Sequence, residues 1–248
     1  MNRDRDLMVE RFHAIKNLGF VKSRRSNNTG IGKTFEDYIG VIENNLEEPD
    51  FAGFEIKSHR SMSQSYITLF TKVPSFPKGA NTYLRNTYGE PYDDALDLKS
   101  LHTSIFADRR NTYMQRLSFK LLDNPISQTI TIGIYDMDGN LIDNRVGYTY
   151  QDVECCLKKK LHNLFYVTAE TQIQNREEYF YFKCADIYME PSLERFMTLL
   201  REGKIMYDIR IGSYKSGAKR GKIHDHGSGF RILEGNMRLL YAQHEIVE

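Results

Sequence analysis

Residues 47–60, EEPDFAGFEIKSHR, bring together side chains that could carry out hydrolytic chemistry. Asp50 follows a proline where a strand is expected to begin, and Glu55 and Lys57 lie two positions apart within that strand. Because side chains alternate along a strand, Glu55 and Lys57 leave one face while their apolar neighbours leave the other. The spacing therefore predicts two carboxylates and one ammonium group in a small volume.

This set of groups suits hydrolysis of a phosphodiester. Oxygen ligands are those that Mg²⁺ prefers, and Mg²⁺ commonly takes one or two carboxylates together with a substrate phosphate. Lys57 could hold or help to deprotonate the attacking water. The arrangement is written P-D-(x)n-E-x-K, and by spacing alone it is equally compatible with a surface strand that carries an ordinary ion pair.

The upstream sequence GIGKT, residues 30–34, resembles the end of a phosphate-binding loop. A P-loop needs a glycine five residues before its Gly-Lys-Thr, and this chain has Asn27 there. The preceding residues are basic and polar, whereas a P-loop follows a buried strand. We therefore interpret the glycines as the entry to a helix that begins near Gly32 and buries Phe35, Ile39 and Ile42.

Hydrophobic periodicity and turn residues predict an intermixed set of helices and strands. Helices are expected over residues 4–18, from about 32 onward, over 150–161 and over 192–203. Strands are expected over 54–59, 66–71, 164–171, 178–189 and 204–212, with a hairpin over 129–144. The predicted fold class is α/β (α+β) with a mixed sheet.

Charge is segregated along the chain although the formal net charge is only +1. Residues 11–35 and 56–89 contain no acid, and residues 210–231 contain six basic residues against one acid. These stretches could converge on a surface that binds a polyanion, or they could be solvated loops.

The three cysteines have no zinc-ribbon or disulfide spacing, so we interpret them as buried or half-buried thiols. The charged, amphipathic N-terminal stretch is not typical of a secretory signal, and no later run is apolar for long enough to span a membrane. We expect a cytoplasmic protein with no membrane partner.

Three stretches together resemble the MvaI/BcnI group of type II restriction endonucleases. They are residues 29–60, residues 68–89 and residues 208–232, which occur in the order found in that group. The resemblance implies a PD-(D/E)xK nuclease core related to the MutH nicking enzyme, with a catalytic lobe and a recognition lobe around DNA. We expect residues 1–125 to form mainly the catalytic lobe and residues 126–248 mainly the recognition lobe, with interleaving allowed.

The resemblance places the catalytic residues at Asp50, Glu55 and Lys57, with Asp50 and Glu55 as ligands of Mg²⁺. Nucleases of this kind often take another carboxylate from the preceding helix, which here is Glu36. In the same helix Lys33 would lie close enough to meet a phosphate.

The third stretch is expected to read DNA sequence. Arg210 and Arg231 could each grip guanine O6 and N7, and Asp208 or Asp225 could accept from cytosine N4. A transition-metal site or a structural histidine pair are the alternatives for His-Asp-His at residues 224–226. The residues predicted to contact DNA are Asp208, Arg210, Tyr214, His224, Asp225, His226, Arg231, Lys33, Lys219, Asn81, Tyr83 and Arg85.

These expectations describe a Mg²⁺-dependent endonuclease that cuts double-stranded DNA at a short, G·C-rich, pseudo-palindromic site of the CCNGG kind. The resemblance further implies a monomer that nicks the two strands in turn, and a companion methyltransferase that protects host DNA. A MutH-like repair nickase and a DNA-binding protein without catalysis remain the alternatives.

Overall fold

The computed structural model describes residues 2–25, 29–40, 50–60 and 65–248, which divide into two compact units. Unit 1 contains residues 1–65, 157–192 and 238–248, and unit 2 contains residues 66–156 and 193–237. The boundary predicted near residue 125 lies inside unit 2, because the chain passes between the units four times. Which unit cleaves and which one reads sequence remains a prediction.

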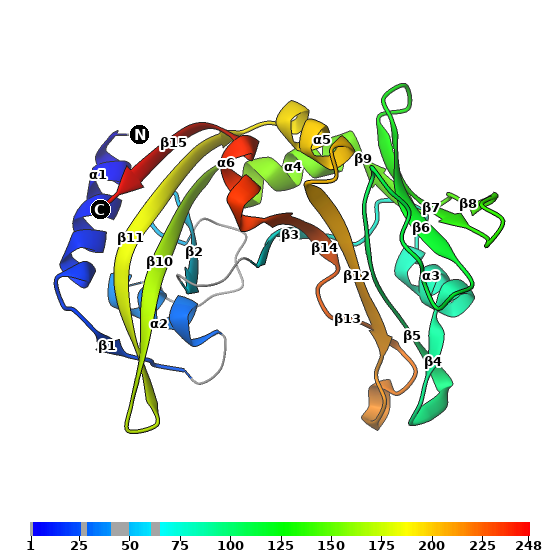
Figure 1. The fold of residues 1–248 in the computed structure, drawn as a ribbon, viewed down its shortest axis with the longest axis horizontal. Coiled ribbons are helices and arrows are strands. Elements are labelled where there is room, and N and C mark those ends of the chain that lie inside the picture. The colour runs from blue at the N-terminus through cyan, green and yellow to red at the C-terminus, as the bar shows by residue number, and fades with distance from the viewer. Residues whose placement is uncertain (1, 26–28, 41–49, 61–64) are drawn as a thin grey trace. The chain divides into compact units, whose positions relative to one another are not determined.

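Unit 1 is built on a five-stranded sheet whose order is β1-β11-β10-β2, with β15 also paired to β11 (Figure 1). The β10–β2 pair is parallel, and the other pairs are antiparallel. This topology places β2 at an edge of the sheet. The elements are α1 (Asn2–Lys16), β1 (Val21–Lys22), α2 (Gly30–Ile39), β2 (Glu55–Arg60), β10 (Asn163–Gln174), β11 (Glu177–Pro191) and β15 (Tyr241–Val247).

The core of unit 1 lies on one face of this sheet, beneath α1 and α2. Four phenylalanines that are fully buried meet there, one from each helix and one each from β10 and β11: Phe12, Phe35, Phe165 and Phe182. Phe35 stacks on Phe165 with ring centroids 6.3 Å apart. Phe54 and Ile56 of the β2 region also enter this core, so Glu55 and Lys57 point to the opposite face, as the alternation predicted.

Unit 2 contains a six-stranded and a four-stranded sheet. The larger sheet has the order β3-β14-β12-β5-β4, with β13 also paired to β12, and the smaller has the order β6-β7-β8, with β9 paired to β7. Its strands are β3 (Tyr66–Thr71), β4 (Glu90–Tyr92), β5 (Ala95–Ile105), β6 (Ser118–Asn124), β7 (Thr129–Tyr135), β8 (Leu141–Asp143), β9 (Gly147–Thr149), β12 (Ile205–Ser213), β13 (Ile223–Asp225) and β14 (Gly229–Leu233).

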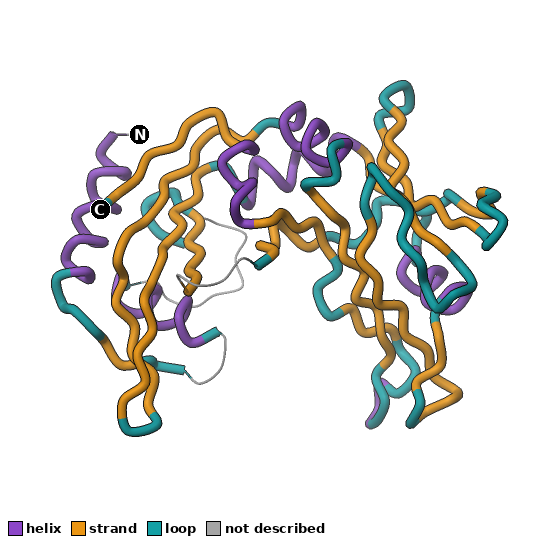
Figure 2. The backbone as a smooth tube through the Cα atoms, viewed as in Figure 1, coloured by secondary structure: helices purple, strands orange, loops and turns teal. Residues whose placement is uncertain are grey.

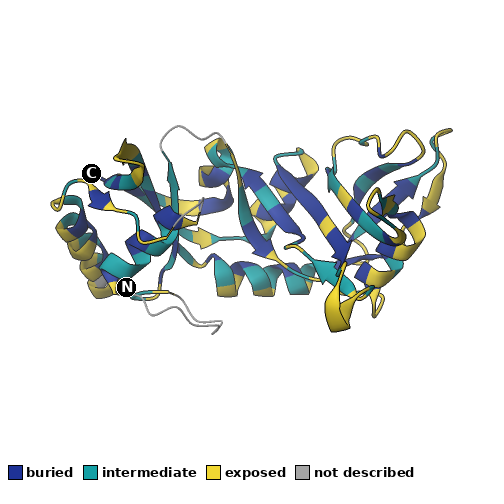
Figure 3. Ribbon diagram, turned by 90° about the horizontal axis from the view of Figure 1, so that it is seen from below, coloured by how far each residue is buried: buried dark blue, intermediate teal, exposed yellow. Residues whose placement is uncertain are grey.

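More of the described backbone lies in strands than in helices (Figure 2). The remaining helices are α3 (Ala80–Tyr88), α4 (Tyr150–Lys160), α5 (Leu193–Arg201) and α6 (Met237–Leu240). In α5 the apolar side chains fall on one stripe, and Phe196 of that stripe packs edge-on against Phe230 of β14. Buried and exposed residues alternate along several strands, as expected where one face of a sheet is covered (Figure 3).

The predicted mixed fold class is confirmed, and most predicted elements are present at shifted ends. The clearest omission is the stretch around Asn81, Tyr83 and Arg85, for which no helix was predicted and which forms α3. That helix is stabilised by burial of Leu84 and Tyr88, a tertiary effect that local propensity does not report. Cys155, which was predicted to be buried or half-buried, is exposed. Ile42, predicted to be buried in the second helix, lies outside the described residues.

Within the described part of the chain, no helix has both the length and the apolar character needed to cross a lipid bilayer.

Candidate functional site

Asp50 is brought to β2 by a tight turn. Phe51 and Phe54 exchange two backbone hydrogen bonds of 3.1 and 2.8 Å around Ala52 and Gly53. The two central residues have φ values of 46° and 75°, and positive φ at both positions is typical of a type I′ hairpin turn. The turn reverses the chain, so that Asp50 lies beside the strand that follows it.

The Asp50 carboxylate is held by one backbone hydrogen bond. Its Oδ2 atom accepts from the N–H of Ile56 at 2.8 Å. Although the residue as a whole is exposed, loss of water around the carboxyl group raises its pKa, and the bond from Ile56 opposes this rise. The negative charge of Glu55 raises the pKa of Asp50 further, which is the pattern expected for two carboxylates that share one site.

Glu55 and Lys57 form an ion pair on the polar face of β2. Lys57 Nζ lies 3.1 Å from Glu55 Oε1, and each side chain is about one quarter exposed. The N–H and C=O groups of one strand residue point toward the same side of the strand. Because the Ile56 N–H donates to Asp50, the Ile56 carbonyl also faces the side of β2 on which Asp50 lies. Two carboxylates and one carbonyl oxygen are hard donors of the type that Mg²⁺ binds.

Glu36 does not complete a three-carboxylate cluster. Helix α2 packs against β2, and Glu36 is half-buried. Within the described ranges, however, no three Asp, Glu, His or Cys side chains are grouped so that they could hold a metal ion. Lys33, predicted to meet a phosphate, forms an ion pair of 2.9 Å with Asp37 one turn later in α2. The catalytic role of Glu36 and the phosphate contact of Lys33 remain predictions.

The polar face of β2 continues into aromatic and histidine side chains that the sequence did not single out. His59 stacks on Tyr166 of β10 with ring centroids 4.4 Å apart, and its Nε2 lies 2.6 Å from Thr168 Oγ1. Burial lowers the pKa of His59. The alternation of residues 55, 57 and 59 was a signal that could have identified His59.

In unit 2, polar residues share one face of the six-stranded sheet. Asp208 and Arg210 of β12 pair in register with Ser104 and His102 of β5, and cross-strand partners project from the same face. Asp208 is at the centre of a network, because it accepts from Arg210 Nε at 2.6 Å and from Ser104 Oγ at 2.9 Å. We call the polar surface of β12, β5, β13 and β14 around these residues the recognition face.

Arg231 lies inside this network, and the guanine contact predicted for it stays a prediction. Its side chain is only 11 % exposed, and its Nε forms an ion pair of 2.9 Å with Asp208 Oδ2. Its other nitrogens donate to Thr68 Oγ1 and to the Gly227 carbonyl. Burial lowers the pKa of Arg231, and the charge of Arg210 lowers it further. Arg210, with 48 % of its side chain exposed, is the arginine of this pair that can reach a ligand.

The histidines and Tyr214 form a row of rings beside Arg210. Tyr214 stacks on His224 at 4.2 Å, and His224 contacts His226 at 4.0 Å. His226 meets His102 edge-on at 6.0 Å. Gly212 makes room for this row, since a Cβ atom there would lie 3.1 Å from His226 Nε2 and 2.6 Å from the Tyr92 hydroxyl. Among the described residues these histidines gather without forming a metal site.

The other carboxylate predicted to read cytosine is also occupied. Asp225 Oδ1 accepts from the backbone N–H groups of Gly227 and Ser228, and its Oδ2 accepts from Asn81 Nδ2 at 2.8 Å. Asp225 and Asn81 therefore hold the turn after β13. The DNA contacts predicted for Asp225 and Asn81 stay predictions.

Tyr83 and Arg85 of α3 likewise face the protein. Tyr83 donates its hydroxyl proton to Asp143 at 2.5 Å. Arg85 is buried, and its Nη1 donates to Ser213 Oγ at 3.0 Å and to the Gly221 carbonyl at 3.1 Å. Arg85 therefore supports the loop after β12, and Tyr83 contacts the end of β8. The DNA contact predicted for both residues stays a prediction.

Acid-free stretches of sequence do not produce acid-free surfaces. Ion pairs join Lys215 to Asp94 at 2.6 Å and Arg220 to Asp97 at 2.7 Å, so acids from β5 and the turn before it neutralise bases of the third stretch. Lys219 instead lies over the ring of Tyr214 at 5.4 Å. Pairing of this kind could not be read from the charge pattern, because the partners are distant in sequence.

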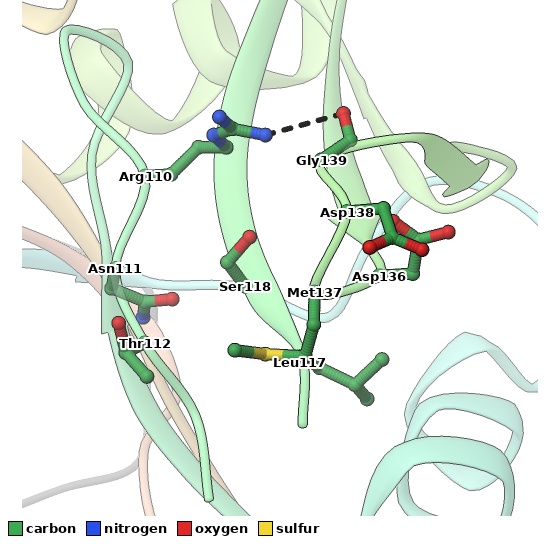
Figure 4. Close-up of a pocket in the computed structure, with 9 residues that line it drawn as sticks. All are labelled: Arg110, Asn111, Thr112, Leu117, Ser118, Asp136, Met137, Asp138 and Gly139. Atoms are coloured by element: carbon green, nitrogen blue, oxygen red, sulfur yellow. Dashed lines mark hydrogen bonds between the residues drawn. The ribbon is translucent and has the colours of Figure 1, made fainter. Parts of the chain in front are cut away.

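Pockets in unit 2 lie both on and away from the recognition face. One lies on the recognition face and is lined by His102, Asp208, Arg210 and His226, among others. The second lies between the loop at Arg110 and the turn of the β7–β8 hairpin, where Arg110 points toward the carbonyl of that turn (Figure 4). Every residue that lines the second pocket is absent from the predicted site.

The comparisons with known proteins decide the family. The model of the MvaI/BcnI restriction endonuclease family matches residues 9–241. The chain belongs to this family. The structure of the complex of restriction endonuclease MvaI with its cognate DNA substrate is 35% identical and matches with a TM-score of 0.86 over 98% of each chain. The structure of MvaI in the absence of DNA is 34% identical, with a TM-score of 0.69 over 100% of this chain and 99% of that chain. No curated protein sequence matches the chain.

As a member of the MvaI/BcnI family, the chain is a restriction endonuclease and hence a site-specific deoxyribonuclease. Restriction endonucleases generally use divalent metal ions. The resemblance found in the sequence is thereby confirmed.

Proposed function

We propose that this member of the MvaI/BcnI family is a Mg²⁺-dependent enzyme that cuts double-stranded DNA at a short, G·C-rich, pseudo-palindromic site of the CCNGG kind. The observation that carries the proposal is the geometry at the open edge of β2. There the type I′ turn places Asp50 beside Ile56, and Glu55 and Lys57 share the same strand. Similarity to the complex of MvaI with its cognate DNA substrate supports a DNA substrate for this chain.

Each residue of this site has a role that follows from its chemistry. Asp50, Glu55 and the Ile56 carbonyl would hold Mg²⁺, which supplies charge neutralisation at the scissile phosphate when it is bound. Asp50 must be ionised to act as a ligand. The Lys57 ammonium group, now paired with Glu55, donates hydrogen bonds and can position the attacking water or stabilise the developing charge. Glu36 in α2 is proposed as an auxiliary carboxylate with a smaller effect.

The recognition face is proposed to select the site. Arg210 projects from β12 with its Nε fixed by Asp208, so its terminal nitrogens are presented for bidentate contact with guanine. We assign Asp208 and Arg231 to holding this arginine. Tyr214, His224 and His226 are proposed to contact the DNA beside it, and Lys219 to contact a phosphate.

The proposal includes partners and assembly. We propose a monomer with one active site, which must nick the two strands in turn, and a companion methyltransferase that protects host DNA without contacting this chain. Both features rest on the resemblance to the MvaI/BcnI group.

The test is incubation of the purified protein with supercoiled plasmid, with and without Mg²⁺. Discrete linear fragments whose ends map to CCNGG sites are the expected result. Nicked circles that are never linearised would favour a nickase. Intact plasmid with a retarded band would indicate binding without catalysis and would contradict the proposal.

A further inference from the structure

A G·C-rich site displays the N4 amino group of cytosine in the major groove, and this group needs a hydrogen-bond acceptor. On the recognition face, Asp208 already accepts from Ser104 and Arg210, and it also pairs with Arg231. Arginine offers only donors, so a residue with an unused acceptor atom would add to what Asp208 can offer.

His102 is placed to do so. It lies directly opposite Arg210 in the β5–β12 pairing, and directly opposed side chains have Cβ atoms about 5 Å apart. His102 is exposed, and it lines the same pocket as Asp208, Arg210 and His226. Neither of its ring nitrogens has a hydrogen-bond partner among the described residues. The ring is held in place by its edge-on contact with His226.

The surroundings of His102 favour the neutral ring. Partial burial lowers its pKa, and the nearby His226 and the charge of Arg210 lower it further, while Asp208 opposes them. A neutral imidazole has one nitrogen that accepts a hydrogen bond and one that donates. His102 therefore adds to this face an acceptor whose capacity is not used within the described part of the protein.

We infer that His102 is a specificity-determining residue, whose unprotonated ring nitrogen accepts from a cytosine N4 amino group in the base pair read by Arg210 or in the pair next to it. The inference rests on the proposed function, because it assigns a residue to the recognition of the same site. A cytosine contact beside a guanine contact is what a C·G-rich target requires.

The test combines a protein variant with the removal of one functional group from the DNA. Cognate duplexes are made in which one cytosine at a time is replaced by 2-pyrimidinone, which lacks only the 4-amino group. Affinity is measured in Ca²⁺, which allows binding without cleavage, for the wild type and for His102→Ala. At one position the analogue should weaken wild-type binding about tenfold, the size expected for one lost base contact, and leave binding by His102→Ala unchanged.

Three controls make the result interpretable. His102→Gln keeps an acceptor oxygen and should recover part of the sensitivity to the analogue. His162→Ala, a change at an exposed histidine of unit 1, should bind like the wild type. Circular dichroism melting should show that each variant is folded.

If His102→Ala and the analogue reduce the affinity independently at every cytosine, so that their factors multiply, the inference is wrong. The enzyme can still be site-specific in that case. If the wild type binds none of the cognate duplexes more tightly than random DNA, the proposed function itself is wrong.

Discussion

The two candidate regions differ in how completely their side chains are held. At the edge of β2, Asp50 is fixed by one backbone hydrogen bond, and Glu55 and Lys57 are fixed mainly by each other. On the recognition face, Asp208 connects Arg231 and Arg210, and Arg231 has further contacts with Thr68 and Gly227. The first group has oxygen atoms free for a ligand, whereas most of the second group is satisfied within the protein.

The two regions therefore need different things in order to act. A set of carboxylates that repel each other is stabilised by a cation, so the β2 site is suited to being completed by a metal ion. A surface that discriminates between bases gains from side chains that are fixed before DNA arrives. Substitutions in each region can separate the need for a metal ion from the need for fixed side chains.

The largest effect is expected at the carboxylates. Asp50→Ala or Glu55→Ala removes a metal ligand and should reduce cleavage below detection, while specific binding in Ca²⁺ is largely retained. Single-turnover cleavage of a cognate duplex measures the loss. Glu170→Ala, at an exposed ion pair with Lys183, is the matched control and should cleave normally. Near-normal cleavage by either site variant would show that the metal site lies elsewhere.

A smaller but still large effect is expected at Lys57. Lys57→Ala should lower the single-turnover rate about 10²–10⁴-fold, because the water or the developing charge loses its partner. Glu36→Gln should cause a smaller drop, since Glu36 is not grouped with the other two carboxylates. An equal loss of cleavage rate in both variants would indicate that Glu36 participates directly in the reaction. If neither variant lost activity, the role of β2 would be purely structural.

The two arginines of the recognition face should behave differently. Arg231→Ala breaks a buried ion pair and should lower the free energy of unfolding by about 3 kcal/mol. Arg210→Ala should leave stability nearly unchanged and cost about 1–3 kcal/mol of discrimination at one base pair. Urea denaturation and mismatch binding assays separate these outcomes. If Arg210→Ala weakens every duplex equally, the face binds DNA without reading it.

The smallest effect concerns the turn that positions Asp50. Ala52 has a φ of 46°, which is unfavourable for a residue with a Cβ atom. Ala52→Gly should therefore raise the free energy of unfolding by about 0.5–1 kcal/mol without reducing the cleavage rate. Loss of stability in urea denaturation would mean that the turn is held by contacts of the alanine methyl group.

Local patterns predicted the faces of β2 on which the side chains lie, because Glu55, Lys57 and their apolar neighbours alternate within one strand. The turn at Ala52 could not be predicted in this way, since alanine rarely adopts positive φ. The internal role of Arg231 depends on Thr68, which is 163 positions away in sequence. The interleaved units are likewise set by long-range pairing, as in the β10–β2 contact.

The most direct test of separate catalytic and recognition regions measures two variants, each in a cleavage assay and in a binding assay. Glu55→Ala and Arg210→Ala are each examined for single-turnover cleavage of saturating cognate DNA in Mg²⁺ and for mismatch discrimination in Ca²⁺. We predict that Glu55→Ala loses cleavage and keeps discrimination, while Arg210→Ala loses discrimination at one base pair and still cleaves. If both variants lose both properties to the same extent, the separation of catalysis at β2 from recognition at β12 is contradicted.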